Sequence, residues 1–230
     1  MSLTFASLQT EVARRGGIDE TDEADTAAAW TRAGLNHISL AGAWTWLKAH
    51  FTLPESGSQT AGDYSWALPA DCFRVAVKTV RYGGKETFLA YRRIDFIDNY
   101  YGPDWKDASA DNGTPRLITR VGNELWTAPK PSAAHLTSYP SLMGYYWRRE
   151  PASGTLYLPD EFREAAVCAA LAEGWLQEDD PRAEKQLDRF EKYWCPRMMG
   201  ATLDVGAGDN VESPGWMDQA YEGSANYGDP

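Results

Sequence analysis

Histidines and cysteines are the residues with which this chain could hold a metal ion or form a nucleophilic centre. The three histidines are His37, His50 and His135. None of them belongs to an HExxH motif or to a pair with ligand spacing. The three cysteines are Cys72, Cys168 and Cys195. An odd number without a CxxC spacing argues against a disulfide framework and a zinc ribbon. We therefore expect no metal site and free, buried thiols.

Paired carboxylates could support general acid/base chemistry, because two carboxyl groups in different surroundings can hold different protonation states. Asp95 with Asp98 and the acidic run 178–180 are such pairs, but helix starts and solvated faces explain them better. The loop 107–113 resembles a calcium loop only loosely, since it lacks the closing glutamate. No GxSxG, Walker or GxGxxG motif follows a strand. The sequence therefore predicts no enzyme and no cofactor.

Composition excludes several other classes. The 230 residues carry 22 Lys and Arg against 33 Asp and Glu, a net charge of −11, which disfavours a face that grips DNA by releasing counterions. No apolar run approaches the roughly 18 residues of a membrane span, and the first five residues do not resemble a secretory signal. We expect a globular protein that stays inside the cell that makes it. Ten Trp and twelve Tyr are typical of interaction surfaces, although sheets also favour them.

The elements that would position these residues begin with two helices. Phe5, Leu8 and Val12 share one helix face, and Gly16 and Gly17 end that helix. A second helix, capped by Asp22, has a narrow apolar stripe of mostly small residues. The stripe consists of Ala27, Trp30, Gly34, Ile38 and Ala41. Such a stripe indicates that another element packs closely against it.

Strand signals dominate from residue 48 to residue 158. Alternation over residues 73–77 and 87–91 around Gly83 and Gly84 predicts a β-hairpin. Further strands are predicted at 116–121, 124–128, 142–148 and 155–158. Between them, residues 94–101 are expected to form a short helix.

Helical spacing returns at Pro159. The predicted apolar face of this helix is Phe162, Ala165, Ala166, Ala169, Ala172 and Leu176. A last helix is capped by Asp180 and is expected to end near Cys195 and Pro196. The fold class is therefore α+β. Residues 1–47 and 159–200 form a small four-helix bundle, residues 48–158 a β-rich insertion, and residues 201–230 an extended acidic tail.

The tail has six acidic residues and no Lys or Arg, so it should not fold alone. Its large side chains are Trp216, Met217, Tyr221 and Tyr227. Aromatic anchors carry much of the energy of interfaces, so we expect these four to bind a neighbouring subunit or another partner. Folding back onto its own domain is the alternative.

The order of short motifs along residues 4–200 resembles that of the head-to-tail adaptor, or connector, proteins of tailed bacteriophages, closest to the podovirus tail tubular, gatekeeper-type adaptors. The motifs lie at 44–47 (WTWL), 68–73 (LPADCF), 113–115 (GTP), 125–131 (LWTAPKP) and 156–162 (LYLPDEF). Their order and spacing carry the resemblance, because each motif alone is short and degenerate.

The resemblance implies a structural virion protein without an active site, made in the host cytoplasm. Twelve copies of the chain would form a ring at the head–tail interface that joins the portal protein to a tail or nozzle protein. Copies would bury small-residue helix faces and aromatic edges against each other. DNA would pass through the lumen without specific binding, and an acidic lumen would help, because it repels phosphate. Tyr100, Tyr101 and Trp105 are expected to face another subunit or the nozzle.

Two rival functions remain open from the residues alone. A carbohydrate-binding β module with helical flanks would use Trp and Tyr as stacking platforms. A glycosidase would use Asp95 or Asp98.

Overall fold

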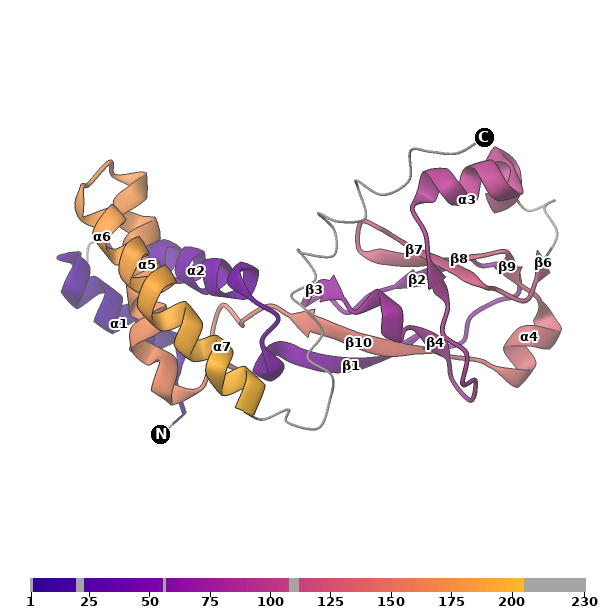
Figure 1. The fold of residues 1–230 in the computed structure, drawn as a ribbon, viewed down its shortest axis with the longest axis horizontal. Helices are drawn as coiled ribbons and strands as arrows, with labels where there is room; N and C mark the ends of the chain where they lie inside the picture. The colour runs from indigo at the N-terminus through magenta and orange to yellow at the C-terminus, as the bar shows by residue number, and fades with distance from the viewer. Residues whose placement is uncertain (1, 20–22, 56, 108–111, 205–230) are drawn as a thin grey trace. The chain divides into compact units, whose positions relative to one another are not determined.

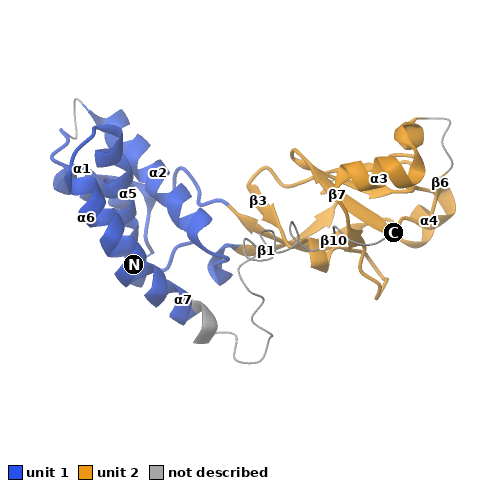
Figure 2. Cartoon of the chain, turned by 45° about the horizontal axis from the view of Figure 1, so that its top comes forward, with its two compact units in different colours: residues 1–47, 149–230 blue, residues 48–148 orange. Residues whose placement is uncertain are grey.

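The computed structural model describes residues 2–19, 23–55, 57–107 and 112–204 (Figure 1). The chain separates into two compact units (Figure 2). The β unit is Lys48–Arg148, and the helical unit consists of the residues on either side of it. All the named strands lie in the β unit, so the predicted α+β class is confirmed. Among the described helices, none is long and apolar enough to cross a membrane.

Helices α1 (Phe5–Gly16) and α2 (Ala24–Ala41) form where helical spacing predicts them. Thr4 and Ser7 begin α1 as a capping box, in which the Ser7 N–H donates to Thr4 Oγ1 over 3.2 Å. Gly17 ends α1 with a φ of 75°, a conformation that glycine adopts at little cost. The predicted cap of α2, Asp22, lies outside the described residues.

Helix α5 (Arg163–Gln177) is the centre of the helical unit and packs against α1, α2 and α6. Residues 165–172 are all buried, so the helix is covered on every side rather than on one stripe. A 3₁₀ turn, Asp160–Phe162, precedes it. Leu176 was predicted on the apolar face and is 61% exposed, because the last turn of α5 instead buries Gly174 and Trp175.

The small-residue stripe of α2 is covered by α5 of the same chain. A Cβ atom added to Gly34 would lie 2.3 Å from the backbone nitrogen of Ala170, and one added to Gly174 would lie 1.9 Å from the ring of Trp30. Trp30 and Gly34 are four residues apart on α2, as Ala170 and Gly174 are on α5. The glycine of α2 therefore packs against the backbone of α5, and the glycine of α5 packs against the Trp30 ring of α2. The expectation that neighbouring copies bury this stripe is wrong.

The last helical run continues beyond its predicted end. It consists of α6 (Arg182–Arg189), a π-helical turn (Phe190–Trp194) and α7 (Cys195–Asp204). Asp180 Oδ1 accepts the Arg182 N–H over 2.8 Å at its start. Pro196 does not end the run, because the widened turn before it accommodates the missing N–H and the bulk of the ring.

A chain of ion pairs joins α1 to α5. Arg15 Nη2 lies 2.6 Å from Glu164 Oε1, and Arg15 Nε lies 2.5 Å from Glu11 Oε1. Arg14 and Arg15 hold the pKa of Glu11 at about 2, and the Arg15 guanidinium also lowers the pKa of Glu164. Since folding depresses both carboxyl pKa values, their contribution to stability is present above the ordinary value of 4.5 and is lost as the pH falls toward 2.

We expect Glu164→Gln to lower the free energy of unfolding at pH 7 by about 1 kcal/mol, because the pair is partly exposed. Thermal unfolding measured from pH 7 to pH 2 should show the difference from the unmodified chain shrinking to zero. Asp188→Asn removes the exposed α6 pair with Lys192 and should have no measurable effect at either pH. A Glu164→Gln difference that persists at pH 2 would contradict this origin.

The β unit contains two sheets of four strands. The first has the order β1 (Lys48–Leu53), β10 (Leu142–Arg148), β3 (Cys72–Val75), with β4 (Arg81–Tyr82) also paired to β10. The second has the order β2 (Ser65–Ala67), β8 (Glu124–Ala128), β7 (Leu117–Val121), β5 (Ala90–Tyr91). A small third sheet pairs β6 (Asn112–Gly113) with β9 (Lys130–Pro131). The strands predicted at 124–128 and 142–148 are confirmed.

The predicted hairpin around Gly83 and Gly84 is only partly present. Arg81 bridges Phe88 across that turn, but β3 pairs with β10 instead of with residues 87–91. A 3₁₀ turn at Val77–Thr79, closed by a 2.7 Å bond from Thr79 Oγ1 to the Ala76 carbonyl, redirects the chain between β3 and β4. Strand β5 then pairs in parallel with β7.

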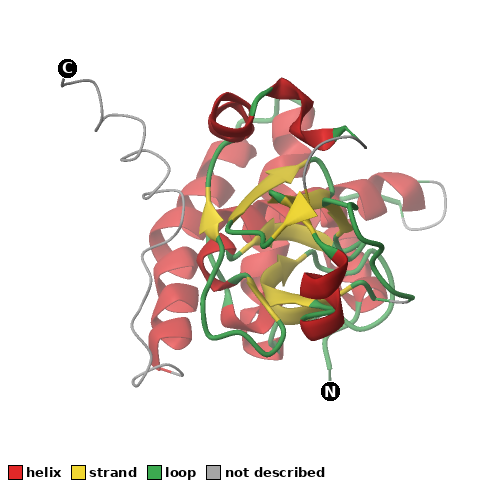
Figure 3. Cartoon of the chain, turned by 90° about the vertical axis from the view of Figure 1, so that its right-hand side faces the viewer, coloured by secondary structure: helices red, strands yellow, loops and turns green. Residues whose placement is uncertain are grey.

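The main core of the β unit draws side chains from both sheets, including Phe51, Tyr146, Trp66 and Ile118. Helix α4 (Ala133–Ser138) contributes Leu136 to it. Helix α3 (Ile94–Tyr101), with the bounds predicted for it, lies beside β7, away from α4 (Figures 1 and 3).

Residues 149–158 belong to the helical unit rather than to the insertion. No strand forms at 155–158; Thr155 makes a single bridge to Thr4, and the Leu156 N–H donates to the Leu3 carbonyl over 2.9 Å. These contacts with the start of α1 replace the predicted strand pairing.

Candidate interaction surface

The predicted contact residues fall into two groups. Trp216, Met217, Tyr221 and Tyr227 lie outside the described residues. Tyr100, Tyr101 and Trp105 lie in α3 and in the 3₁₀ turn Pro103–Lys106 that follows it. Tyr100 is 69% exposed, Tyr101 is partly buried and Trp105 is buried. Of the second group, Tyr100 alone presents most of its side chain to solvent.

An aromatic cluster fixes α3 on the sheet. Its buried members are Ile97, Trp105 and Ala128, and Tyr64, Tyr101 and Trp126 pack against them. Tyr64 meets both indole rings edge-on, with centroids 5.2 Å from Trp105 and 5.1 Å from Trp126. Trp105 thus holds the helix in place from within the β unit, which the sequence alone did not indicate.

Asp98 belongs to the same support. Its Oδ1 accepts the Trp105 Nε1–H over 2.7 Å and lies 3.1 Å from Lys106 Nζ. The hydrogen bond from Trp105 and the Lys106 ammonium lower the pKa of Asp98, so the carboxylate is stabilised in its charged form. Asp95, its predicted partner for acid/base work, is exposed and pairs with Arg93 at 3.3 Å. Asp98 is therefore held in its charged form, whereas the acid of a glycosidase must carry a proton.

The solvent side of α3 carries an aromatic surface. Phe96 and Tyr100 lie four residues apart on α3, on a different face from the buried Ile97, and Arg92 lies four residues before Phe96, just ahead of the helix. Phe96 and Tyr100 stack with centroids 6.1 Å apart and planes at 11°, and the Arg92 guanidinium lies 5.6 Å from the Phe96 centroid. Beside them along the chain, Tyr91 and Phe88 are 37% and 55% exposed, and Arg81 lies 5.8 Å above the Phe88 ring. We call Phe88, Tyr91, Arg92, Phe96 and Tyr100, exposed residues within thirteen positions of one another along the chain, the α3 surface.

Sequence reasoning found Tyr100 and missed the other four members of the α3 surface. The four-residue spacing of Arg92, Phe96 and Tyr100 was the available signal. It was obscured because residues 94, 97 and 101 give α3 a second apolar face, and only the sheet beneath decides which face is buried.

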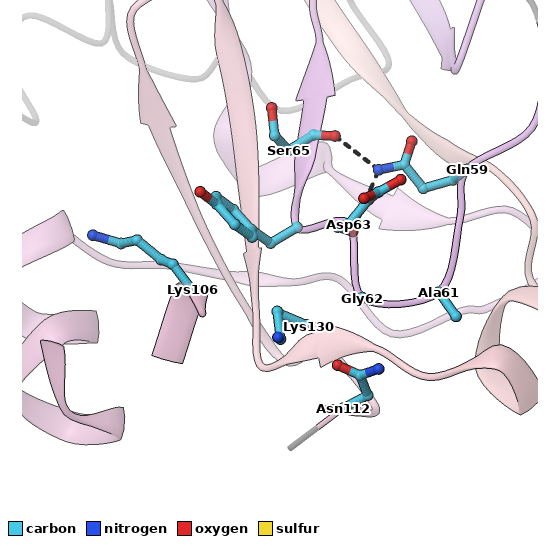
Figure 4. Close-up of a pocket in the computed structure, with 9 residues that line it drawn as sticks. Gln59, Ala61, Gly62, Asp63, Ser65, Lys106, Asn112 and Lys130 are labelled. Atoms are coloured by element: carbon cyan, nitrogen blue, oxygen red, sulfur yellow. Dashed lines mark hydrogen bonds between the residues drawn. The ribbon is translucent and has the colours of Figure 1, made fainter. Parts of the chain in front are cut away.

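An open depression of about 550 Å³ lies at the turn before β2 (Figure 4). Gln59 Nε2 spans this turn, donating to the Ser65 carbonyl over 2.8 Å and to the Asp63 carbonyl over 3.3 Å. Lys106 is paired with Asp98, and the buried Lys130 ammonium donates to the Asp107 carbonyl. Both lysines of the depression are thus held by groups outside its lining.

The histidines serve packing and surface contacts. His37 Nδ1 lies 2.6 Å from Glu173 Oε1, His50 meets Tyr145 edge-on, and His135 is buried, with its ring centroid 4.4 Å from that of Tyr82. Within the described ranges, no group of three or more His, Cys, Asp or Glu could hold a metal ion.

Charge is divided unevenly along the chain. Residues 48–148 carry twelve Lys and Arg and ten Asp and Glu, a net charge of +2. The remaining 129 residues carry ten basic and 23 acidic side chains, a net charge of −13. The acidic character of the protein therefore comes from the residues outside the β unit.

Comparison with known proteins identifies a family. No curated protein sequence matches the chain. The sequence profile described as SU10 adaptor protein matches residues 3–208, which covers both units. The chain therefore belongs to the SU10 adaptor protein family and is a structural head-to-tail adaptor protein of a bacteriophage.

Proposed function

We propose that this protein forms a ring, of twelve copies, that joins the portal protein of the capsid to the tail or nozzle. The family match over residues 3–208 carries the proposal. The exposed aromatic side chains of the α3 surface support it, because clustered exposed rings are typical of interaction sites. In this proposal the function is mechanical, and binding between subunits replaces catalysis.

DNA passage fits the distribution of charge. A lumen lined by residues outside 48–148 would carry a net negative charge and would repel the phosphate backbone, so DNA would slide without specific binding. The carbohydrate-binding alternative is less well supported, since Arg81 and Arg92 lie over the Phe88 and Phe96 rings, where a sugar would stack.

The tail after residue 203 is proposed to anchor each copy on its partner in the assembly through Trp216, Met217, Tyr221 and Tyr227. A chain truncated after residue 203 should keep both folded units, because their cores lie before that point, and should fail to assemble onto purified portal. Mass photometry and negative-stain microscopy measure the assembly of the truncated chain. The full-length chain, measured with and without portal, is the reference.

Full-length protein should show a closed ring with a uniform copy number. Normal assembly of the truncated chain onto portal would reject the anchoring role of the tail. A full-length chain that stays monomeric with portal present, or that is retained on polysaccharide resin, would contradict the proposed function itself.

A further inference from the structure

The α3 surface holds half of the large hydrophobic side chains that are exposed in the described part of the chain. Eight such side chains are exposed in the described residues, and four of them, Phe88, Tyr91, Phe96 and Tyr100, lie within thirteen consecutive residues. The neighbouring aromatic cluster already fixes the buried side of α3, so these rings are not needed to hold the helix. Side chains of this kind gain most free energy when a partner covers them.

Arginines accompany the rings of the α3 surface. The guanidinium groups of Arg81 and Arg92 lie over ring faces, and the exposed Arg93 pairs with Asp95 at 3.3 Å. A guanidinium held over a ring keeps N–H donors at its edge for an incoming carboxylate, and in Arg92 one of them already donates to the Tyr91 carbonyl over 2.9 Å. The chemistry that fits this surface is an acidic segment that also carries aromatic side chains.

Residues 205–230 of this chain have that chemistry. They carry five acidic side chains and no Lys or Arg, and their large apolar residues are Trp216, Met217, Tyr221 and Tyr227. Acidic residues alternate with the aromatic ones, as Asp218 and Glu222 do around Tyr221. At about 3.3 Å per extended residue, these 26 residues can span up to ~85 Å.

We propose that residues 205–230 of one copy bind the α3 surface of the neighbouring copy. Every copy supplies one segment and one surface, so the same contact repeats around a closed ring without leaving either unfilled. This inference rests on the proposed ring and names the contact that closes it.

Photo-crosslinking in the full-length protein tests this contact. Tyr100→p-benzoylphenylalanine places a crosslinker on the α3 surface, and Leu176→p-benzoylphenylalanine places one at an exposed position of the helical unit as a matched control. Each variant is prepared as an equal mixture of ¹⁴N and ¹⁵N copies, irradiated and digested. Mass spectrometry should find peptides from 205–230 crosslinked at position 100, joining light to heavy copies.

The charge of the surface gives a second readout. Arg92→Glu, added to the Tyr100 crosslinking variant, should lower the yield about fivefold, the equivalent of about 1 kcal/mol. Arg197→Glu, which alters a comparable arginine over Tyr193 in the helical unit, should leave it unchanged. About 0.5 M salt should also lower the yield, because it screens exposed charges.

Mass photometry of the same samples separates the possible failures. Three outcomes in samples that form rings would overturn this inference and leave the proposed function standing. They are the absence of crosslinks from position 100 to residues 205–230, a crosslink yield no higher than at position 176, and crosslinks confined to single copies. Monomers without crosslinks would overturn both.

Discussion

Replacing Gly174 with alanine should lower the free energy of unfolding by about 3 kcal/mol, although alanine is the better helix former. The added Cβ would lie 1.9 Å from Cδ2 of Trp30, an indole that is 3% exposed and has no room to move aside. Helices α2 and α5 would have to separate, and the reciprocal contact of Gly34 with Ala170 would open with them. Urea unfolding followed by far-ultraviolet circular dichroism measures the change.

Gly200 supplies the matched control, because it lies within α7 and an added Cβ would meet nothing within 4 Å. Gly200→Ala should leave the protein unchanged or stabilise it by up to about 1 kcal/mol. A double-mutant cycle checks the cause: in a Trp30→Leu background, Gly174→Ala should cost much less. An equal cost in both backgrounds would show that Trp30 is not the obstacle.

Thr127→Val should destabilise the β unit by about 3 kcal/mol while preserving the shape of the side chain. The Thr127 hydroxyl accepts the Trp66 indole N–H over 3.2 Å and the Tyr82 hydroxyl over 3.5 Å, and it lies 3.4 Å from the Tyr64 carbonyl oxygen, to which it donates. Trp66 and Tyr82 are each 1% exposed, and burial raises the pKa of Tyr82. Valine would leave both buried donors without this acceptor.

Thr127→Ser is the informative comparison, because it keeps the hydroxyl and removes only a methyl group. We expect it to cost about 1 kcal/mol, clearly less than Thr127→Val. The urea midpoints of both variants, with tryptophan fluorescence as the probe, give the order. Equal midpoints would mean that packing and not hydrogen bonding governs this position.

These two sites keep each unit rigid, and rigidity matters for a head-to-tail adaptor. In the proposed ring, a surface on a helix packed over a sheet would lose little conformational freedom on binding another subunit. Tyr100 and Phe96 have this support through Ile97 and Trp105.

Several elements of the fold could be predicted because their determinants are close in sequence. Gly17 in the left-handed conformation ends α1, and the turn at Gly122 joins β7 to β8. The bounds predicted for α3 and β10 are those observed. The head-to-tail adaptor family was likewise predicted from the order of motifs, whereas the gatekeeper subtype and the ring of twelve stay predictions.

Tertiary structure alone decided the pairing of β3 with β10 and the parallel pairing of β5 with β7, since both join segments distant in the chain. It also decided which aromatic residues are buried. Trp105 and Tyr100 look alike in sequence, but the sheet surface beneath α3 covers the first and leaves the second exposed. The sequence by itself determined where several elements begin, among them α1, α3 and β10, because propensities and turns are local. Only the assembled fold determined what each element packs against, because burial depends on contacts between distant residues.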